Sequence, residues 1–152
     1  MLSCRDRRYA AEIPVITTVS APAPVGAYPH ARRVGQLLFL SGVGPRVPGT
    51  NEIPGNVHDA DGKLIRYDIQ AQCRQVFANV LAVLEASGAH WEDLVDVTVF
   101  LTDMARDFAA YNRVYAEYFR DPATAPCRTT LGITALPTPI AIELKCVAVL
   151  PR

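Results

Sequence analysis

The 152-residue sequence has no net charge, because fifteen lysines and arginines balance fifteen aspartates and glutamates. Without a strong positive field, the chain has no overall attraction for nucleic acid or an anionic membrane, and a nuclease role gains no support. No apolar run reaches the ~18 residues that a membrane helix needs. The charged N-terminus is not followed by the apolar stretch and cleavage site of a signal peptide. We therefore expect a cytoplasmic protein that binds neither nucleic acid nor membrane.

Metal-binding and cofactor motifs are also missing. Three histidines, His30, His58 and His90, are scattered without ligand spacing. No phosphate loop, dinucleotide fingerprint, HExxH or GxSxG occurs. The segment Asp59-Ala60-Asp61-Gly62 resembles the start of a calcium loop but lacks its closing glutamate, so we interpret it as a turn. We expect no metal and no cofactor. The four cysteines, which lack CxxC or zinc-like spacing, are Cys4, Cys73, Cys127 and Cys146. They are expected to be reduced and mostly buried, and Cys127 is the candidate exception because it adjoins Arg128.

What is present is the composition of one globular domain, with 50% hydrophobic and 20% charged residues. We expect an N-terminal arm over residues 1–24 and a single domain over 25–152. A long connection rich in proline and glycine, 44–67, is expected to be functional or disordered. The expected strands are a short one at Val15–Val19, then Ala31–Val34, Leu37–Ser41, Leu94–Leu101, Arg128–Thr134 and Ile140–Leu150.

Two helices are predicted, one from an Asp68 cap to about Ser87 and one from an Asp103 cap to about Phe119. The first has one apolar face, and the second has an aromatic stripe that is typical of a core. On the strand Leu94–Leu101, alternate residues from Val95 to Leu101 should share one face. This order favours an α+β layer in which two helices cover one face of a mixed sheet. The last strand is apolar on both sides, so the other face is expected to meet another subunit.

Two charged residues lie within the apolar C-terminal strands. Arg128 opens one of them and Glu143 lies inside the other. Charges in such segments are costly unless they are paired or used. An arginine can hold a carboxylate with two parallel hydrogen bonds, and a glutamate in a partly dry site can carry protons at neutral pH. Together they suggest a pocket for an acidic molecule, although a structural ion pair between them would explain both.

The order and spacing of several segments resemble those of a known family. The segments Leu38–Gly42, Gln72–Leu84 and Asp93–Leu101, the helix motif from Tyr111 to Phe119, Pro126-x-Arg128 and Ile142-Glu143 follow each other at the spacings of the RidA family (YjgF/YER057c/UK114). The resemblance covers roughly residues 25 to 150. It implies a chorismate mutase-like α+β fold, and a homotrimer whose other sheet faces form a central barrel and whose sites lie between subunits. It also implies cofactor-free hydrolysis of enamines or imines.

Within the family, the stretch Ala27–Arg33 and the long loop before the first helix most resemble 2-aminomuconate deaminase. That resemblance implies deamination of a small dicarboxylate enamine, 2-aminomuconate, to 2-oxo-3-hexenedioate (4-oxalocrotonate) and ammonia in aromatic catabolism. The alternatives are a general deaminase of 2-aminoacrylate-type intermediates and a non-catalytic module that binds a small carboxylate.

Site residues follow from the family resemblance position by position. Arg128 matches the carboxylate-binding arginine, and Glu143 matches the glutamate that positions water. Residues expected to line the cleft are Tyr28, Asn112, Ser41 and Gly42, with His30 as a further polar contact or proton shuttle. A second carboxylate at the far end of the substrate would meet His30 or a basic residue near the long loop, and the candidates are Arg46, Arg66 and Arg74. Where the family often has a cysteine, this chain has Thr130. Each position also has a simpler interpretation: Tyr28 as interface packing, Asn112 as a plain helix residue and His30 as a satisfied structural histidine.

Overall fold

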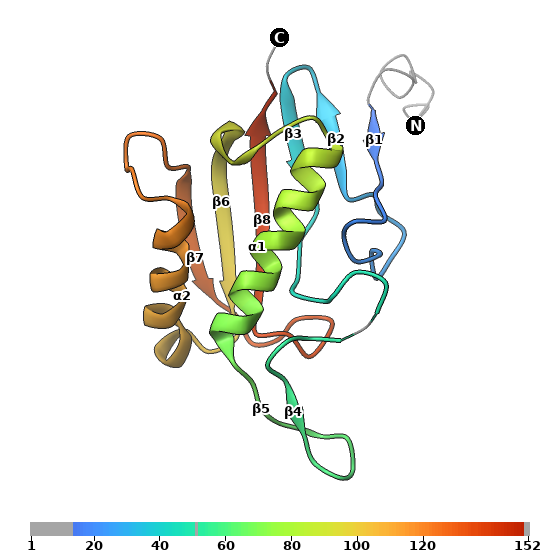
Figure 1. Cartoon of the computed structure of the whole chain (residues 1–152), viewed down its shortest axis with the longest axis vertical. Helices are drawn as coiled ribbons and strands as arrows, with labels where there is room; N and C mark the ends of the chain where they lie inside the picture. Colours follow the sequence, from blue (N-terminus) through green and yellow to red (C-terminus); the bar gives the residue numbers. More distant parts are fainter. Residues whose placement is uncertain (1–13, 51, 151–152) are drawn as a thin grey trace, which may run out of the picture.

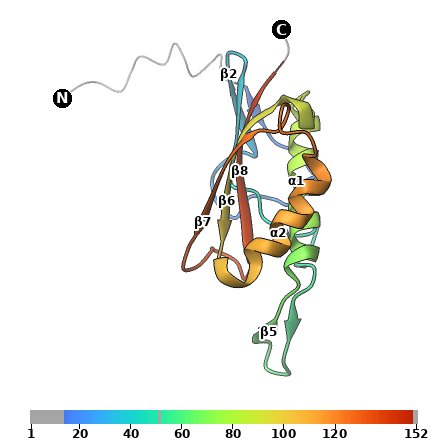
Figure 2. The ribbon, with the colours of Figure 1, turned by 90° about the vertical axis from the view of Figure 1, so that its left-hand side faces the viewer.

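The main feature of the fold is a six-stranded mixed sheet with two helices packed on one of its faces (Figures 1 and 2). The structure, a computed structural model, describes residues 14–50 and 52–150. The elements in chain order are β1 (Val15–Ile16), β2 (Ala31–Val34), β3 (Leu37–Leu40), β4 (Val57–His58), β5 (Leu64–Arg66), α1 (Ile69–Ala86), the 3₁₀ turn η1 (Trp91–Asp93), β6 (Leu94–Leu101), α2 (Met104–Tyr118), β7 (Cys127–Gly132) and β8 (Ile142–Val149).

The sheet order is β1-β2-β3-β8-β6-β7, and only the β6–β7 pair is parallel. The predicted α+β architecture is therefore confirmed. Because β1 pairs with β2 and Ala21 is buried in the core, residues from Val15 onward are built into the domain. The charged tail Arg5–Arg8 lies outside the described residues.

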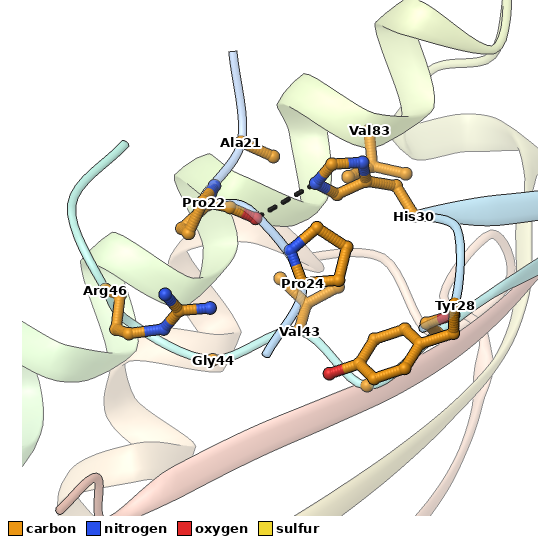
Figure 3. Close-up of a pocket in the computed structure, with 11 residues that line it drawn as sticks. Ala21, Pro22, Pro24, Tyr28, His30, Val43, Gly44, Arg46 and Val83 are labelled. Carbon is orange, nitrogen blue, oxygen red and sulfur yellow. Dashed lines mark hydrogen bonds between the residues drawn. The ribbon is translucent and has the colours of Figure 1, made fainter. Parts of the chain in front are cut away.

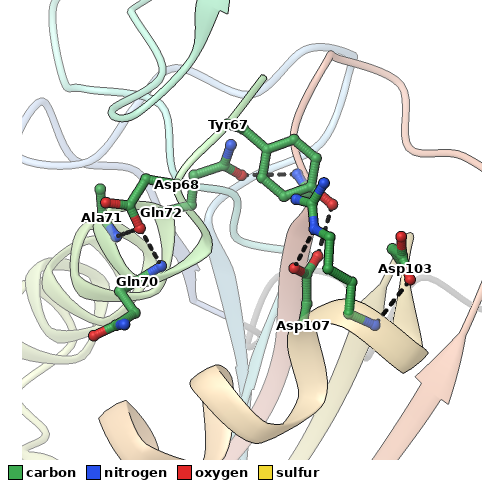
Figure 4. Close-up of polar contacts among 9 residues, drawn as sticks. Tyr67, Asp68, Gln70, Ala71, Gln72, Asp103 and Asp107 are labelled. Atoms are coloured by element: carbon green, nitrogen blue, oxygen red, sulfur yellow. Dashed lines mark hydrogen bonds and ion pairs between the residues drawn. The ribbon is translucent and has the colours of Figure 1, made fainter. Parts of the chain in front are cut away.

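Both predicted helix starts are confirmed. The Asp68 carboxylate accepts hydrogen bonds from the backbone N–H groups of Gln70 and Ala71 at 2.9 and 3.2 Å (Figure 4). Asp103 does the same for Arg106 at 3.0 Å. The first helix ends because Gly88 adopts a φ of 76°, which glycine accepts without steric cost.

An aromatic cluster joins the two helices. Phe77 of α1 stacks on Tyr118 of α2 with ring centroids 4.4 Å apart, and Trp91 meets Phe119 edge-on at 5.6 Å. The aromatic stripe predicted for α2 is thus largely core, with the exception of Phe108, which is exposed. Beneath the cluster, α1 contributes fully buried side chains to the sheet-facing core: Cys73, Val76, Val80, Val83 and Leu84.

A second contact between helix and loop is polar. Asp107 is buried, and its carboxylate accepts a hydrogen bond from the Tyr67 hydroxyl at 2.6 Å and another from Arg106 Nε at 2.9 Å. The Arg106 guanidinium lies 3.7 Å from the centre of the Tyr67 ring. Nearby, Gln72 accepts a hydrogen bond from the Ala141 N–H and so ties α1 to the start of β8. These bonds explain how a buried carboxylate is tolerated.

The structure differs from the sequence predictions at two places. Val95 does not share the buried face of β6, because the β6–β8 register shifts between Leu94 and Asp96 and turns its side chain outward. Within the 44–67 connection, β4 and β5 form a hairpin that extends away from the sheet (Figure 2). Its turn is the one predicted at Asp59–Gly62, where Asp59 accepts hydrogen bonds from the N–H groups of Asp61 and Lys63.

The sheet face opposite the helices is not covered by any other element of the described chain (Figure 2). Strand register places alternate residues of β8, Glu143, Lys145, Val147 and Val149, on this open face. Its exposed apolar members come from four strands: Val34, Leu37, Phe39, Leu131 and Val149. Glu143, one of the two charged residues predicted for the site, therefore lies on this open face.

Candidate active site

A pocket of about 350 Å³ lies at the edge of the open face, where the chain leaves β3 and β8 begins. Glu143 contributes the carboxylate, and Tyr28, Ser41 and Gly42 contribute neighbouring walls. Four of the seven residues predicted for the site therefore meet in one place. The bridge between Val43 and Leu144, with N–O distances of 2.8 and 3.0 Å, holds the two segments side by side.

Gly42 gives the Glu143 carboxylate its position. A Cβ atom at residue 42 would lie 2.8 Å from the Glu143 carboxyl carbon, closer than real Cβ contacts. The carboxylate thus lies directly against the backbone after β3. Burial raises the pKa of Glu143 above its ordinary value. No described residue forms an ion pair with it. A half-buried carboxyl group without a charged partner is well suited to accept and return protons.

Arg128 lies elsewhere. Its register partner on β6 is Val97, whose side chain is buried beneath the helices, whereas Glu143 is opposite Phe100 on the open face. The Arg128 guanidinium is 4.5 Å from the Tyr115 ring centre and 5.5 Å from that of Tyr111, both on α2. These rings hold a cation at the edge of the sheet by cation–π attraction.

Within one chain, Arg128 and Glu143 therefore lie on opposite faces and on strands separated by β6. The structural ion pair considered from the sequence does not form inside the described chain. A pocket that uses both residues requires a second copy to bring them together. Asn112, half-buried on α2 next to Tyr111, belongs to the Arg128 side.

His30 lines a smaller cavity beside the main pocket, under the segment 21–24 (Figure 3). Its Nε2 lies 2.9 Å from the Pro22 carbonyl oxygen, and its Nδ1 accepts a hydrogen bond from the Thr18 N–H at 3.3 Å. Both ring nitrogens are used by the backbone and the side chain is buried. The geometry therefore favours the structural interpretation of His30 over a substrate contact or a proton shuttle.

Tyr28 and Ser41 belong to the pocket wall. The Tyr28 hydroxyl accepts a hydrogen bond from the Val25 N–H at 3.3 Å, and the residue is 43% exposed. The Ser41 hydroxyl donates to the Pro29 carbonyl at 2.6 Å. Ser41 therefore fixes the segment that carries Tyr28, and Tyr28 stays open to a ligand or to another subunit.

Two cations also line this pocket, and of these only Lys145 was not named for the site from the sequence. Lys145 lies two residues after Glu143 on the same face of β8, and Arg46 follows the glycines after β3. Arg46 was one of three arginines named for a distal carboxylate. The other two are elsewhere: Arg74 is paired with Glu117, and Arg66 lies on the hairpin beside Arg106. The alternation of β8 was the signal that would have found Lys145.

Comparison with known proteins identifies the family. The family model of endoribonuclease L-PSP matches residues 18–150. The chain belongs to this family, which is the RidA/YjgF family that the sequence resembles. A RutC family protein of Synechocystis is 42% identical over 137 residues, covering 90% of this chain and 96% of the relative. Reactive Intermediate Deaminase A of Arabidopsis thaliana, a chloroplastic protein, is 38% identical over 136 residues, covering 90% of this chain and 65% of that protein.

Solved structures of family members have the same fold. The crystal structure of Escherichia coli TdcF with bound serine matches with a TM-score of 0.77 and 33% identity, covering 91% of this chain and 99% of that one. The predicted family and fold are thus confirmed.

The Arabidopsis relative and TdcF of Escherichia coli are named for reactive intermediates, and these names favour the general deaminase alternative over 2-aminomuconate as the substrate. Among the described residues, no helix is long and apolar enough to cross a membrane.

Proposed function

We propose that this protein hydrolyses small enamines and imines derived from amino acids and releases ammonia, at sites formed between copies of the chain. The observation that carries the proposal is Glu143: a half-buried carboxyl group with a raised pKa, no charged partner among the described residues, and a position against Gly42 in a ligand-sized pocket. Family membership and relatives that are named reactive-intermediate deaminases support the chemistry.

The mechanism uses two charged groups. Arg128 holds the α-carboxylate of the substrate with two hydrogen bonds, which places the adjacent carbon–nitrogen bond beside Glu143. The enamine first tautomerises to an imine, whose carbon is electrophilic. Glu143 takes a proton from water as the oxygen adds to the carbon of the protonated imine, giving a neutral carbinolamine. The same carboxyl group gives this proton to nitrogen. The carbon–nitrogen bond then breaks while the hydroxyl oxygen forms the carbonyl and its proton passes back to the Glu143 carboxylate, and ammonia and a 2-oxo acid leave, ammonia carrying that proton away as ammonium.

A homotrimer would complete the site. The open face exposes apolar side chains over four strands, and a surface of that kind is typical of an interface between copies. Joining three open faces into a central barrel would bring the sheet edge that carries Arg128 toward the Glu143 pocket of a neighbour. The chain alone separates these residues, so we expect a monomer to be inactive.

The test is ammonia release from an imine generated in situ by an amino-acid oxidase. We expect the wild-type protein to accelerate hydrolysis and Glu143→Gln to abolish that acceleration. A non-catalytic module would instead bind the carboxylate and leave hydrolysis at the uncatalysed rate in both proteins. Measuring 2-oxo acid binding to the Glu143→Gln protein separates these cases, since only the deaminase loses turnover while it keeps binding. No acceleration by the wild type would refute the proposed function.

A further inference from the structure

Two cationic side chains line the same pocket as Glu143, one from each neighbouring segment. Arg46 comes from the loop after β3, and Lys145 comes from β8, on the same sheet face as Glu143. Figure 3 draws the adjoining smaller cavity, which Arg46 and Tyr28 also line, with the guanidinium and the phenol on opposite sides of it. The pocket therefore combines one carboxylate with two positive charges, even though the whole chain is neutral.

Neither cation is neutralised by a described carboxylate. The ion pairs among residues 14–50 and 52–150 are Arg74–Glu117 and Arg106–Asp107, both remote from this pocket. Arg46 Nη2 donates to the Ala23 carbonyl at 2.6 Å, and Lys145 Nζ lies 3.4 Å from the Leu40 carbonyl. Each contact uses one donor, so both cations keep further N–H donors for a ligand.

We infer that Arg46 and Lys145 bind a second acidic group of the substrate, so the preferred substrates are enamines or imines of dicarboxylic amino acids. This inference rests on the proposed function, in which Arg128 of another copy holds the α-carboxylate. A distal carboxylate then meets the Arg46–Lys145 pair on the opposite side of the reacting carbon. The pocket volume of about 350 Å³ fits the lower range of small-molecule sites.

A simpler role for Lys145 would be to neutralise Glu143. The two residues are neighbours on one face of β8, but they form no ion pair, and burial is the cause of the raised pKa of Glu143. A lysine paired with this glutamate would lower that pKa instead. Lys145 is therefore available to a ligand anion.

The experiment compares two imines of equal chain length that differ only in a distal carboxylate. The imine of glutamate is made with glutamate oxidase, and the imine of norvaline is made with a general amino-acid oxidase; semicarbazide traps whatever is not hydrolysed. We expect kcat/KM to be about tenfold higher for the glutamate imine, which corresponds to about 1.4 kcal/mol. In the Arg46→Gln/Lys145→Gln protein the ratio of the two kcat/KM values should fall to about one. Placing arginine instead of glutamine at position 145 (Lys145→Arg) should restore part of this ratio.

The control replaces two exposed cations of the β4–β5 hairpin in the same way, Lys63→Gln/Arg66→Gln, and should keep the wild-type ratio. Calorimetric binding of 2-oxoglutarate against 2-oxopentanoate provides a readout that does not need turnover. Equal kcat/KM values for the two imines, or an unchanged ratio in the double variant, would overturn the inference and leave the proposed deaminase activity standing. Preferential binding of 2-oxoglutarate without any turnover would support anion binding by Arg46 and Lys145 and overturn the proposed function alone. 2-Aminomuconate, as a longer dicarboxylate enamine, serves as a third substrate.

Discussion

Gly42→Ala is the substitution that most directly tests how Glu143 is positioned. The new Cβ atom would lie 2.8 Å from the Glu143 carboxyl carbon, whereas ordinary contacts begin near 3.4 Å. The carboxylate would have to move by roughly 0.6–1 Å, and a 1 Å misplacement of a catalytic group can cost about 100-fold in rate. That factor corresponds to about 2.7 kcal/mol of transition-state stabilisation. The backbone should tolerate alanine, because Gly42 is not among the glycines with positive φ.

The assay is kcat/KM for imine hydrolysis, together with the melting temperature. Gly132→Ala is the matched control, since its Cβ would make an ordinary 3.4 Å contact with Met104 on the opposite side of the sheet. A Gly42→Ala/Glu143→Gln double variant should be no worse than Glu143→Gln alone, because both changes act through one carboxyl group. Gly42→Ala activity within twofold of wild type, at an unchanged melting temperature, would show that Gly42 does not set the position of the Glu143 carboxylate.

Three further predictions concern the cation, the carboxyl group and the core. Arg128→Ala should lower kcat/KM by the equivalent of roughly 2–5 kcal/mol; a near-normal rate would show that the anchor lies elsewhere. Burial raises the pKa of Glu143 above 4.5, so the folded protein loses stability as the pH rises from about 4.5 through the raised pKa and the carboxyl group ionises. Glu143→Gln should therefore gain stability relative to wild type at about pH 7 compared with about pH 4, in urea titrations; a gain confined to low pH would reverse the sign. Phe77→Ala, which removes the centre of the aromatic cluster, should cost about 3–5 kcal/mol of unfolding free energy, and a cost below ~1 kcal/mol would contradict its core role.

Much of the fold could be predicted because its local determinants are strong. Asp68 and Asp103 are good helix caps, and alternating apolar residues define the long strands. The β4–β5 hairpin was not predicted, because it pairs only a few residues and the proline and glycine of the 44–67 connection are typical of loops. Val95 was misplaced because one shift of register in β6 is invisible to simple alternation.

The site was harder to predict, because the sequence does not show which sheet face each strand presents. Arg128 and Glu143 both looked like charges in apolar strands, yet parallel pairing with β6 puts the first on the helix side. His30 was named for chemistry because its residue type allows it, but its hydrogen bonds depend on the fold of segment 18–22. Lys145 was not assigned to the site, because the alternation of β8 shows only that it shares a face with Glu143, and its place in the pocket depends on how the segment after β3 folds.

Co-expression of two inactive variants tests whether each site takes Arg128 from one copy and Glu143 from another. Arg128→Ala and Glu143→Gln chains are co-expressed, with each homogeneous variant as its own control. If the chains mix randomly in trimers, about one quarter of sites should regain both native residues, so the mixture should recover roughly a quarter of wild-type kcat. Activity no higher than that of the separate variants, in trimers shown by mass spectrometry to be mixed, would contradict a shared site.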